Sequence, residues 1–146
     1  EIVEVLRGKY NRVVNETVAS GPGLRNIHWA LHCIKNKRYE EYSSEEIFKQ
    51  IHNSEIAKLS VDLFFEMLGQ IAGDFALAIG AFDGILITGD LINSNSHLIQ
   101  ESLFRFGFEN KDNYQDLMQN IPTSIINIPE VGLLGIYQFY NLKQAE

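Results

Sequence analysis

The sequence predicts an α/β fold that is rich in helices and contains two parallel strands. Two short isoleucine-rich stretches, residues 82–88 and 123–128, have glycine or proline at their ends, as short strands do. Helical patterns fill most of the rest, so the order is helices followed by β-α-α-β-α. Because a helical crossover joins the two strands, we expect them to lie parallel, with a right-handed connection.

Three helices are predicted before residue 52. Residues 1–10 have an amphipathic pattern, and apolar side chains three or four positions apart predict a helix over Leu24 to Lys35. Between them, Gly21-Pro22-Gly23 predicts a break. The run Ser43-Ser44-Glu45-Glu46 is typical of a helix start, and that helix continues to residue 51.

The longest predicted helix covers Leu59 to Gly80, after a short turn or helix at 54–58. Its apolar stripe is so wide that we expect much of its circumference to be buried between other layers. Gly69, Gly73 and Gly80 would let a neighbouring element approach closely, at a cost in helix propensity. Three further helices are expected after residue 88, over about 96–106, 112–120 and 131–142.

The run Ile85–Thr88 is typical of a buried strand that stops at a glycine turn, Gly89. The carboxyl ends of parallel strands are where α/β proteins place ligands, although a plain strand–turn–helix connection has the same pattern. Parallel sheets are normally covered on both faces and have more than two strands. We therefore expect the missing strands to come from residues upstream of Glu1 or from a partner chain.

Composition excludes several classes of function. The formal net charge of −7 and the pI of about 5.1 argue against nucleic-acid and anionic-membrane partners. The single cysteine, Cys33, allows no internal disulfide and no cysteine-built zinc site, and we expect it to fill the core. No secretory signal or bilayer-length apolar run is present, so the expected location is the cytoplasm.

The four histidines do not predict a metal site. His28 and His32 have the spacing of four that can bind a metal on one helix face, but no third ligand is evident. We therefore expect histidines of the core or surface. The chain also begins abruptly with a helical pattern and without an initiator Met, so we expect a fragment of a longer chain.

Four motifs occur in the order of one known family. Glu16-Thr17-Val18-Ala19-Ser20-Gly21-Pro22-Gly23-Leu24 resembles the Glu-x-Val-x-Ser-Gly-Pro-Gly-Leu segment of bacterial glucokinases. The long helix that ends at Gly80, followed by Phe82-Asp83-Gly84 and the strand, is similar to a helix–strand pair of the same family. The remaining matches are Phe104-Arg105, Phe108-Glu109 and Lys111, then Ile121-Pro122 before a strand, and Gly132-Leu133-Leu134-Gly135.

The resemblance covers nearly the whole chain and implies the ribonuclease H-like fold of actin-like ATPases and sugar kinases. Residues 1–146 would then be a single partial domain, a C-terminal domain without its first strands and without the N-terminal domain. The family implies phosphoryl transfer from ATP to the 6-hydroxyl of glucose, with Mg²⁺, in a homodimer. Its aspartate base, phosphate loops and Glu-x-x-His sugar pair would precede Glu1. No catalytic residue or metal ligand is therefore assigned, and the fragment is expected to be inactive.

The resemblance assigns ligand contacts to a few residues. Glu16 matches the glutamate that binds a sugar hydroxyl, a role that suits a carboxylate, although an exposed acid or a cap is the alternative. Ser20, Gly21 and Gly23 would form a tight turn that brings the next helix near the nucleotide, or simply a turn. Gly89 matches the first glycine of the adenosine-binding Gly-Gly, where the backbone approaches the nucleotide closely.

Asp90 departs from the family, which has a second glycine at this position. A carboxylate beside a triphosphate is unfavourable, but Asp90 would avoid this cost as a helix cap or if it faces adenosine. Besides a glucokinase fragment, a non-catalytic sugar-binding or regulatory protein with weakened ATP binding therefore remains open. A purely structural helical domain would require that the two strands are not parallel in one sheet.

Overall fold

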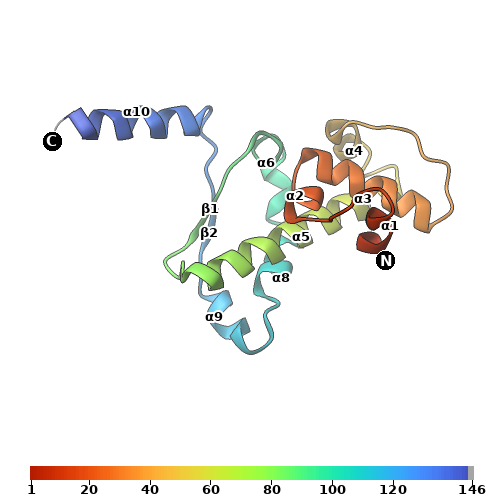
Figure 1. Ribbon diagram of the computed structural model, residues 1–146, viewed down its shortest axis with the longest axis horizontal. Coiled ribbons are helices and arrows are strands. Elements are labelled where there is room, and N and C mark those ends of the chain that lie inside the picture. The colour runs from red at the N-terminus through yellow and green to blue at the C-terminus, as the bar shows by residue number, and fades with distance from the viewer. Residues whose placement is uncertain (145–146) are drawn as a thin grey trace.

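The computed structural model describes residues 1–144 and shows a helical body, a two-stranded sheet and a terminal helix that extends away from both (Figure 1). The elements, in chain order, are α1 (Ile2–Arg7), α2 (Asn15–Val18), α3 (Gly21–Ile34), α4 (Ser44–Lys49), α5 (Glu55–Ile79), β1 (Ile85–Ile87), α6 (Asp90–Ser94), α7 (Ser96–Ile99), α8 (Phe104–Glu109), the 3₁₀ helix η1 (Asp112–Tyr114), α9 (Gln115–Gln119), β2 (Thr123–Ile125) and α10 (Val131–Gln144).

Serine side chains begin the main helices of the body. The Ser43 hydroxyl accepts a hydrogen bond from the backbone of Glu46, whose carboxylate accepts one from the Ser43 backbone, so the predicted capping signal is confirmed. The Ser20 hydroxyl likewise accepts from the Gly23 N–H at 3.0 Å. The break predicted at Gly21-Pro22-Gly23 is wrong, because these residues form the first turn of α3. Proline fits there because the first helical N–H groups have no partner within the helix.

Helix α5 is the central element of the body, and it is longer than predicted. The segment 54–58, expected as a separate turn or helix, supplies its cap and first turn, and Ser54 accepts a hydrogen bond from the Ala57 N–H. The helix ends at Gly80, whose left-handed φ of 68° favours glycine. Burial is narrower than predicted near this end, where Phe75 and Ile79 are 57% and 74% exposed.

Helices α5 and α8 pack with their backbones almost in contact. A Cβ atom on Gly69 would lie 2.0 Å from the carbonyl oxygen of Phe104, and one on Gly107 would lie 2.1 Å from that of Glu66. The close approach predicted at Gly69 is therefore confirmed, as it is at Gly73, where a Cβ would lie 2.6 Å from the Phe108 carbonyl oxygen. The prediction is wrong at Gly80, where the nearest atom to a Cβ would be 3.9 Å away. The helix predicted over 96–106 is instead two helices, α7 and α8, since the chain turns at 100–103 so that Phe104 and Phe108 reach the core.

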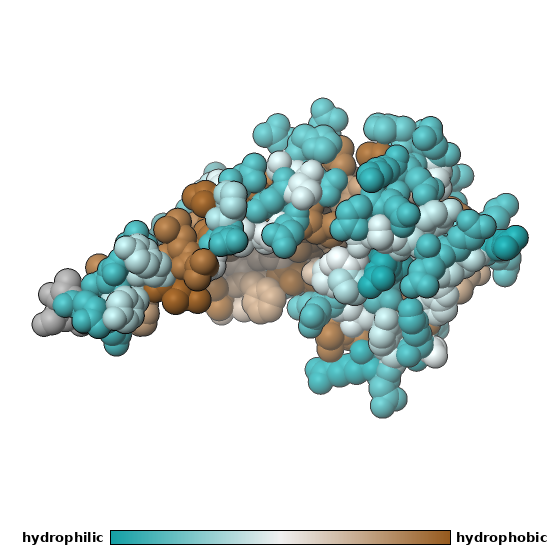
Figure 2. Space-filling model, turned by 90° about the horizontal axis from the view of Figure 1, so that it is seen from above, coloured by the Kyte–Doolittle hydropathy of each residue, from teal (hydrophilic) through white to brown (hydrophobic). Residues whose placement is uncertain are grey.

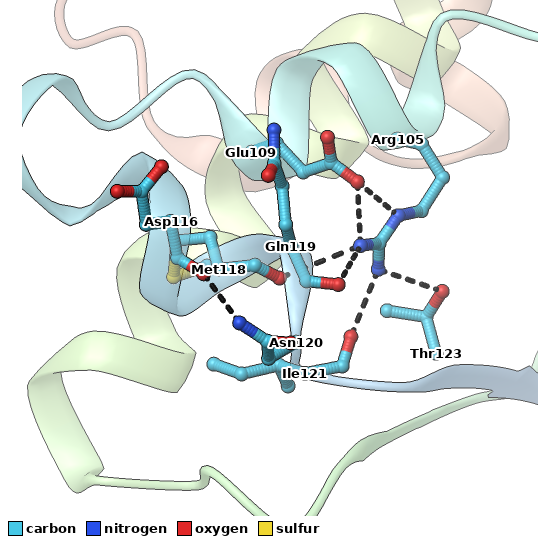
Figure 3. Close-up of polar contacts among 8 residues, drawn as sticks. All are labelled: Arg105, Glu109, Asp116, Met118, Gln119, Asn120, Ile121 and Thr123. Carbon is cyan, nitrogen blue, oxygen red and sulfur yellow. Dashed lines mark hydrogen bonds and ion pairs between the residues drawn. The ribbon is translucent and has the colours of Figure 1, made fainter.

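Arg105 joins α8 to the end of α9 and the start of β2 (Figure 3). Its guanidinium pairs with the Glu109 carboxylate on the same helix and donates to the Ile121 carbonyl oxygen at 3.0 Å. Longer hydrogen bonds of 3.4 Å reach the Thr123 hydroxyl and the carbonyl oxygens of Met118 and Gln119. Because the guanidinium presents five donors in a plane, one side chain serves all these acceptors.

The two strands are parallel, as predicted, with Ile85 opposite Thr123 and Ile87 opposite Ile125. Regular pairing is shorter than the predicted stretches 82–88 and 123–128. The prediction that the first strand is fully buried is wrong, because Leu86 is 69% exposed while its neighbours are half-buried. Alternate side chains of a strand point to opposite faces, so one face of the described sheet is open.

In the view of Figure 2, a broad apolar area lies between the helical body and α10, and most of the exposed large apolar residues occur from Phe75 onward in the chain. No described residue of α10 is buried, although the helix carries Leu133, Ile136, Tyr137 and Phe139. Cys33 is exposed, so the expectation that it fills the core is wrong. Within residues 1–144, no helix combines the length and the apolarity that crossing a membrane requires.

Candidate functional site

A cavity of about 320 Å³ opens at the carboxyl end of β1. The residues that follow the strand, Thr88, Gly89 and Asp90, form one side of it, and Ser20 and Gly21 at the start of α3 form another. Segments about 70 positions apart in the sequence thus meet in one place. Its apolar part comes from α5, the end of β1 and α6, through Phe64, Leu68, Ile87, Leu91 and Ile92, with Ala19 beside them.

Gly89 shapes the turn that enters the cavity. Its φ of 142° and ψ of 146° lie in a region that side-chain-bearing residues rarely adopt. A Cβ atom there would meet nothing within 4 Å, so the backbone is glycine-specific because of its conformation and borders open space. Asp90 follows as the first residue of α6, and its side chain is exposed at the cavity.

The three residues of the predicted turn have different surroundings. Ser20 donates a hydrogen bond to the Glu16 carbonyl oxygen at 2.7 Å and accepts one from Gly23, so its hydroxyl is engaged in capping. Gly21 lines the cavity, and its carbonyl oxygen accepts a hydrogen bond from Ser44. Gly23 does not line the cavity. It faces α2 instead, and a Cβ atom there would lie 2.5 Å from the backbone of Val18. Gly23 therefore allows α2 and α3 to pack closely.

Glu16 lines a second cavity, of about 220 Å³. The Glu16 side chain is exposed in the first turn of α2. Ser20 lines both this cavity and the cavity at Gly89. Tyr10 and Asn26 line the second cavity, and the Tyr10 hydroxyl donates to the Asn26 side-chain oxygen at 2.8 Å. The Asn26 amide in turn donates to the Thr17 carbonyl oxygen. This network fixes polar groups beside the carboxylate.

Sequence reasoning missed several residues of this region. Phe64 and Leu68 line the cavity at Gly89, but in the sequence they read as ordinary members of an apolar helix stripe. Asn26 is 6% exposed and lies on the buried face of α3. Its position as a polar residue among apolar ones could have indicated a structural or functional role. Tyr10, at the end of the first helical segment, had no comparable signal.

The described residues supply no evident metal centre. No group of three or more His, Cys, Asp and Glu side chains within residues 1–144 lies close enough to share an ion. His28 and His32 pack edge to face, with ring centroids 4.7 Å apart, and His32 also contacts the Arg38 carbonyl oxygen. Burial, followed by the proximity of His32, lowers the pKa of His28 to about 4. His28 is thus a buried neutral histidine at neutral pH.

Relatives of this chain are glucokinases. A profile of the family described as Glucokinase matches residues 1–143. The glucokinase of Xylella fastidiosa strain 9a5c is 38% identical over 135 residues, which are 92% of this chain and 40% of the relative. The glucokinase of Stenotrophomonas maltophilia strain K279a is 35% identical over the same shares of the two chains. The chain therefore spans about 40% of the length of the curated relatives it matches.

The fold agrees with this similarity. A crystal structure of glucokinase from an Antarctic psychrotroph superposes on 92% of this chain with a TM-score of 0.84, at 26% sequence identity, over 42% of the length of that structure. The helix-rich architecture with two parallel strands is therefore that of part of a glucokinase. Together with the family profile over residues 1–143, these similarities show that the chain belongs to the glucokinase family.

Proposed function

We propose that this chain is the C-terminal part of an ATP-dependent glucokinase, which transfers a phosphoryl group from ATP to the 6-hydroxyl of glucose. The observation that carries the proposal is that Ser20 borders both the cavity at Gly89 and the cavity at Glu16. Phosphoryl transfer depends mainly on holding donor and acceptor side by side. Two adjoining cavities, one for the nucleotide and one for the sugar, suit that requirement.

Within this proposal, each cavity has a defined task. The Glu16 carboxylate accepts a hydrogen bond from a sugar hydroxyl, and the fixed Asn26 side chain lies beside it. The open backbone at Gly89 lets the nucleoside approach, while Phe64 and Leu68 offer an apolar surface to the base. The base that deprotonates the sugar is assigned to the part of a glucokinase that residues 1–146 do not match, so the chain alone is expected to be inactive.

Magnesium accompanies ATP in this proposal, but the described residues do not suit it. Asp90 is the only carboxylate among the residues that line the cavity at Gly89. Magnesium prefers several oxygen ligands in octahedral geometry, often with one or two carboxylates and the phosphates themselves. We therefore assign no magnesium ligand within residues 1–144.

A chimaera tests the proposed activity. Residues 1–143 of this chain would replace the matching segment of the Xylella fastidiosa glucokinase, and glucose-dependent ADP formation would be measured. We expect turnover by the chimaera, none by residues 1–146 alone, and a loss of at least about tenfold in kcat/KM on Glu16→Gln. Glu4→Gln, on the exposed face of α1, is the matched control. Turnover by residues 1–146 alone, or a folded chimaera without glucose-dependent turnover, would contradict the proposal.

Asp90 supports one alternative, a non-catalytic sugar-binding or regulatory protein with weakened ATP binding. The carboxylate lies in the cavity where the family has glycine, and repulsion of the triphosphate would weaken binding. This alternative expects Asp90→Gly to raise ATP affinity in the chimaera, measured by calorimetry. We also propose that the protein forms a homodimer, because Phe75, Ile79 and Leu86 expose apolar surface around an open sheet.

A further inference from the structure

Asp90 is the only charged residue among those that line the cavity at the end of β1. Other carboxylates form the ion pairs of residues 1–144, namely Glu55, Asp62, Asp74 and Glu109. The remaining lining residues are apolar, glycine, or the hydroxyl-bearing Ser20 and Thr88. A cavity with one carboxylate and no lysine or arginine is unsuited to a phosphate group, whose binding sites are rich in cations and backbone N–H groups.

The same lining suits an uncharged ligand that offers hydroxyl groups. We infer that Asp90 binds the ribose of a nucleotide by accepting hydrogen bonds from its 2′- and 3′-hydroxyls, and thereby selects ribonucleotides at this site. The inference rests on the nucleotide-binding role proposed above for Gly89. It assigns a ligand-binding function to Asp90, which stands where the family has its second glycine.

The position of Asp90 supports this role in three ways. Asp90 follows the open turn at Gly89, where a Cβ atom would meet nothing within 4 Å. A carboxylate has two oxygens, so it can accept from two adjacent hydroxyls at once, and an acidic residue that binds ribose hydroxyls is a recurrent device of nucleotide sites. Phe64 and Leu68 line the same cavity and can cover the base.

The ribose role also removes the electrostatic conflict. The hydroxyls lie at the opposite edge of the sugar from the 5′-phosphate, so the carboxylate and the phosphates are separated by the ribose. Repulsion between exposed charges decreases with distance and is screened by water and salt. A hydrogen bond to a charged group, in contrast, acts at contact distance and is worth about a tenfold change in affinity or more.

The test compares nucleosides that differ only in their hydroxyls. Residues 1–146 would be titrated with adenosine and with 2′,3′-dideoxyadenosine, following the backbone amide resonances of Thr88 and Gly89 by NMR. We expect adenosine to bind at least about tenfold more tightly than the dideoxy compound. In Asp90→Gly and in Asp90→Asn this ratio should fall to about twofold or less, and adenosine and ATP should both bind more weakly. Asp83→Asn, an equal change of charge outside the cavity, is the control for Asp90→Asn.

The outcomes separate this inference from the proposed function. Equal binding of the two nucleosides by the unchanged chain would overturn the ribose role and leave the nucleotide site in place. Tighter ATP binding by Asp90→Gly would overturn it in favour of the non-catalytic alternative. Circular dichroism would confirm that each variant is folded. If no folded variant bound adenosine or ATP, both the inference and the nucleotide part of the proposed function would be contradicted.

Discussion

His28 is a titratable residue whose pKa is strongly shifted by its burial in the fold. It is 2% exposed, its Nδ1 atom has no hydrogen-bond partner within the described residues, and the rings of His32, Tyr39 and Tyr42 surround it. Charging this imidazole would require an unsolvated cation next to a second histidine. The pKa therefore decreases from 6.5 to about 4.

We predict that His28 makes the free energy of unfolding pH-dependent. The unfolded chain takes up the proton near pH 6.5, whereas the folded chain resists it until about pH 4. The stabilising effect of the neutral residue is thus complete above pH 6.5 and is lost as the pH falls toward 4, by at most about 3 kcal/mol. Urea unfolding at pH 7.5 and 4.5 measures it. His28→Phe should show a smaller decrease, and the exposed His52→Gln should match the unchanged chain; equal decreases in all three would contradict the prediction.

Arg105 shows how one residue can hold together elements that are far apart in the sequence. Lysine keeps the charge but lacks the planar set of donors that reaches Glu109, Ile121 and Thr123 together. We expect Arg105→Lys to lower the free energy of unfolding by about 2 kcal/mol in urea titrations. Arg7→Lys, at an exposed site of α1, should change it by less than about 0.5 kcal/mol. A similar small effect at Arg105 would show that its hydrogen bonds are weak.

At the scale of elements, the Phe-Arg…Phe-Glu-x-Lys motif has a structural task. Phe104 and Phe108 are buried with stacked rings, and the Lys111 ammonium donates to the Gln70 carbonyl oxygen and the Asp74 carboxylate on α5. The glycines of both helices complete this interface by letting the backbones touch. The motif therefore stabilises the α5–α8 pair, which supports the wall of the candidate nucleotide cavity through Phe64 and Leu68.

The α5–α8 contact yields a sharp prediction. Gly69→Ala would place a methyl group 2.0 Å from the Phe104 carbonyl oxygen, so the helices must separate. We expect the free energy of unfolding to fall by about 3 kcal/mol or more. Gly132→Ala in α10 is the control, because a Cβ there meets nothing within 4 Å and should leave the body unchanged. Equal stability of the two variants in thermal unfolding would mean that the contact is not tight.

How well the sequence predicts a feature depends on the range of the interactions that determine that feature. Local signals predicted α1, α4, α10 and most of α3 and α5, together with the Ser43 cap, because spacing and capping act within a few residues. The short helices α2 and α6 were not predicted. The first turn of α3 was mistaken for a break because Gly and Pro permit both outcomes. The strand ends and the exposure of Cys33 depend on neighbours that the sequence pattern does not reveal. The meeting of Ser20 with Gly89 could be anticipated only through the family resemblance.

For the molecule as a whole, the distribution of apolar surface predicts self-association. Phe75 and Ile79 are exposed at the end of α5, near the open sheet, although both belong to the apolar stripe of that helix. We expect residues 1–146 to be dimeric or larger in light scattering at micromolar concentration, and the double variant Phe75→Gln, Ile79→Gln to shift toward monomer. Leu117→Gln, another exposed apolar site, is the control. A monodisperse monomer before any substitution would contradict this prediction.

The position of α10 has a further consequence for local stability. An isolated helix of 14 residues is marginal in water, and this one has no buried residue to add packing energy. Its hydrogen-bonded amides can therefore open without disturbing α5 or α8, whose opening would separate their closely packed backbones. In hydrogen–deuterium exchange, the amides of α10 should exchange within seconds while those in the middle of α5 stay protected. If another protein surface packed against α10, the amides of this helix would exchange more slowly.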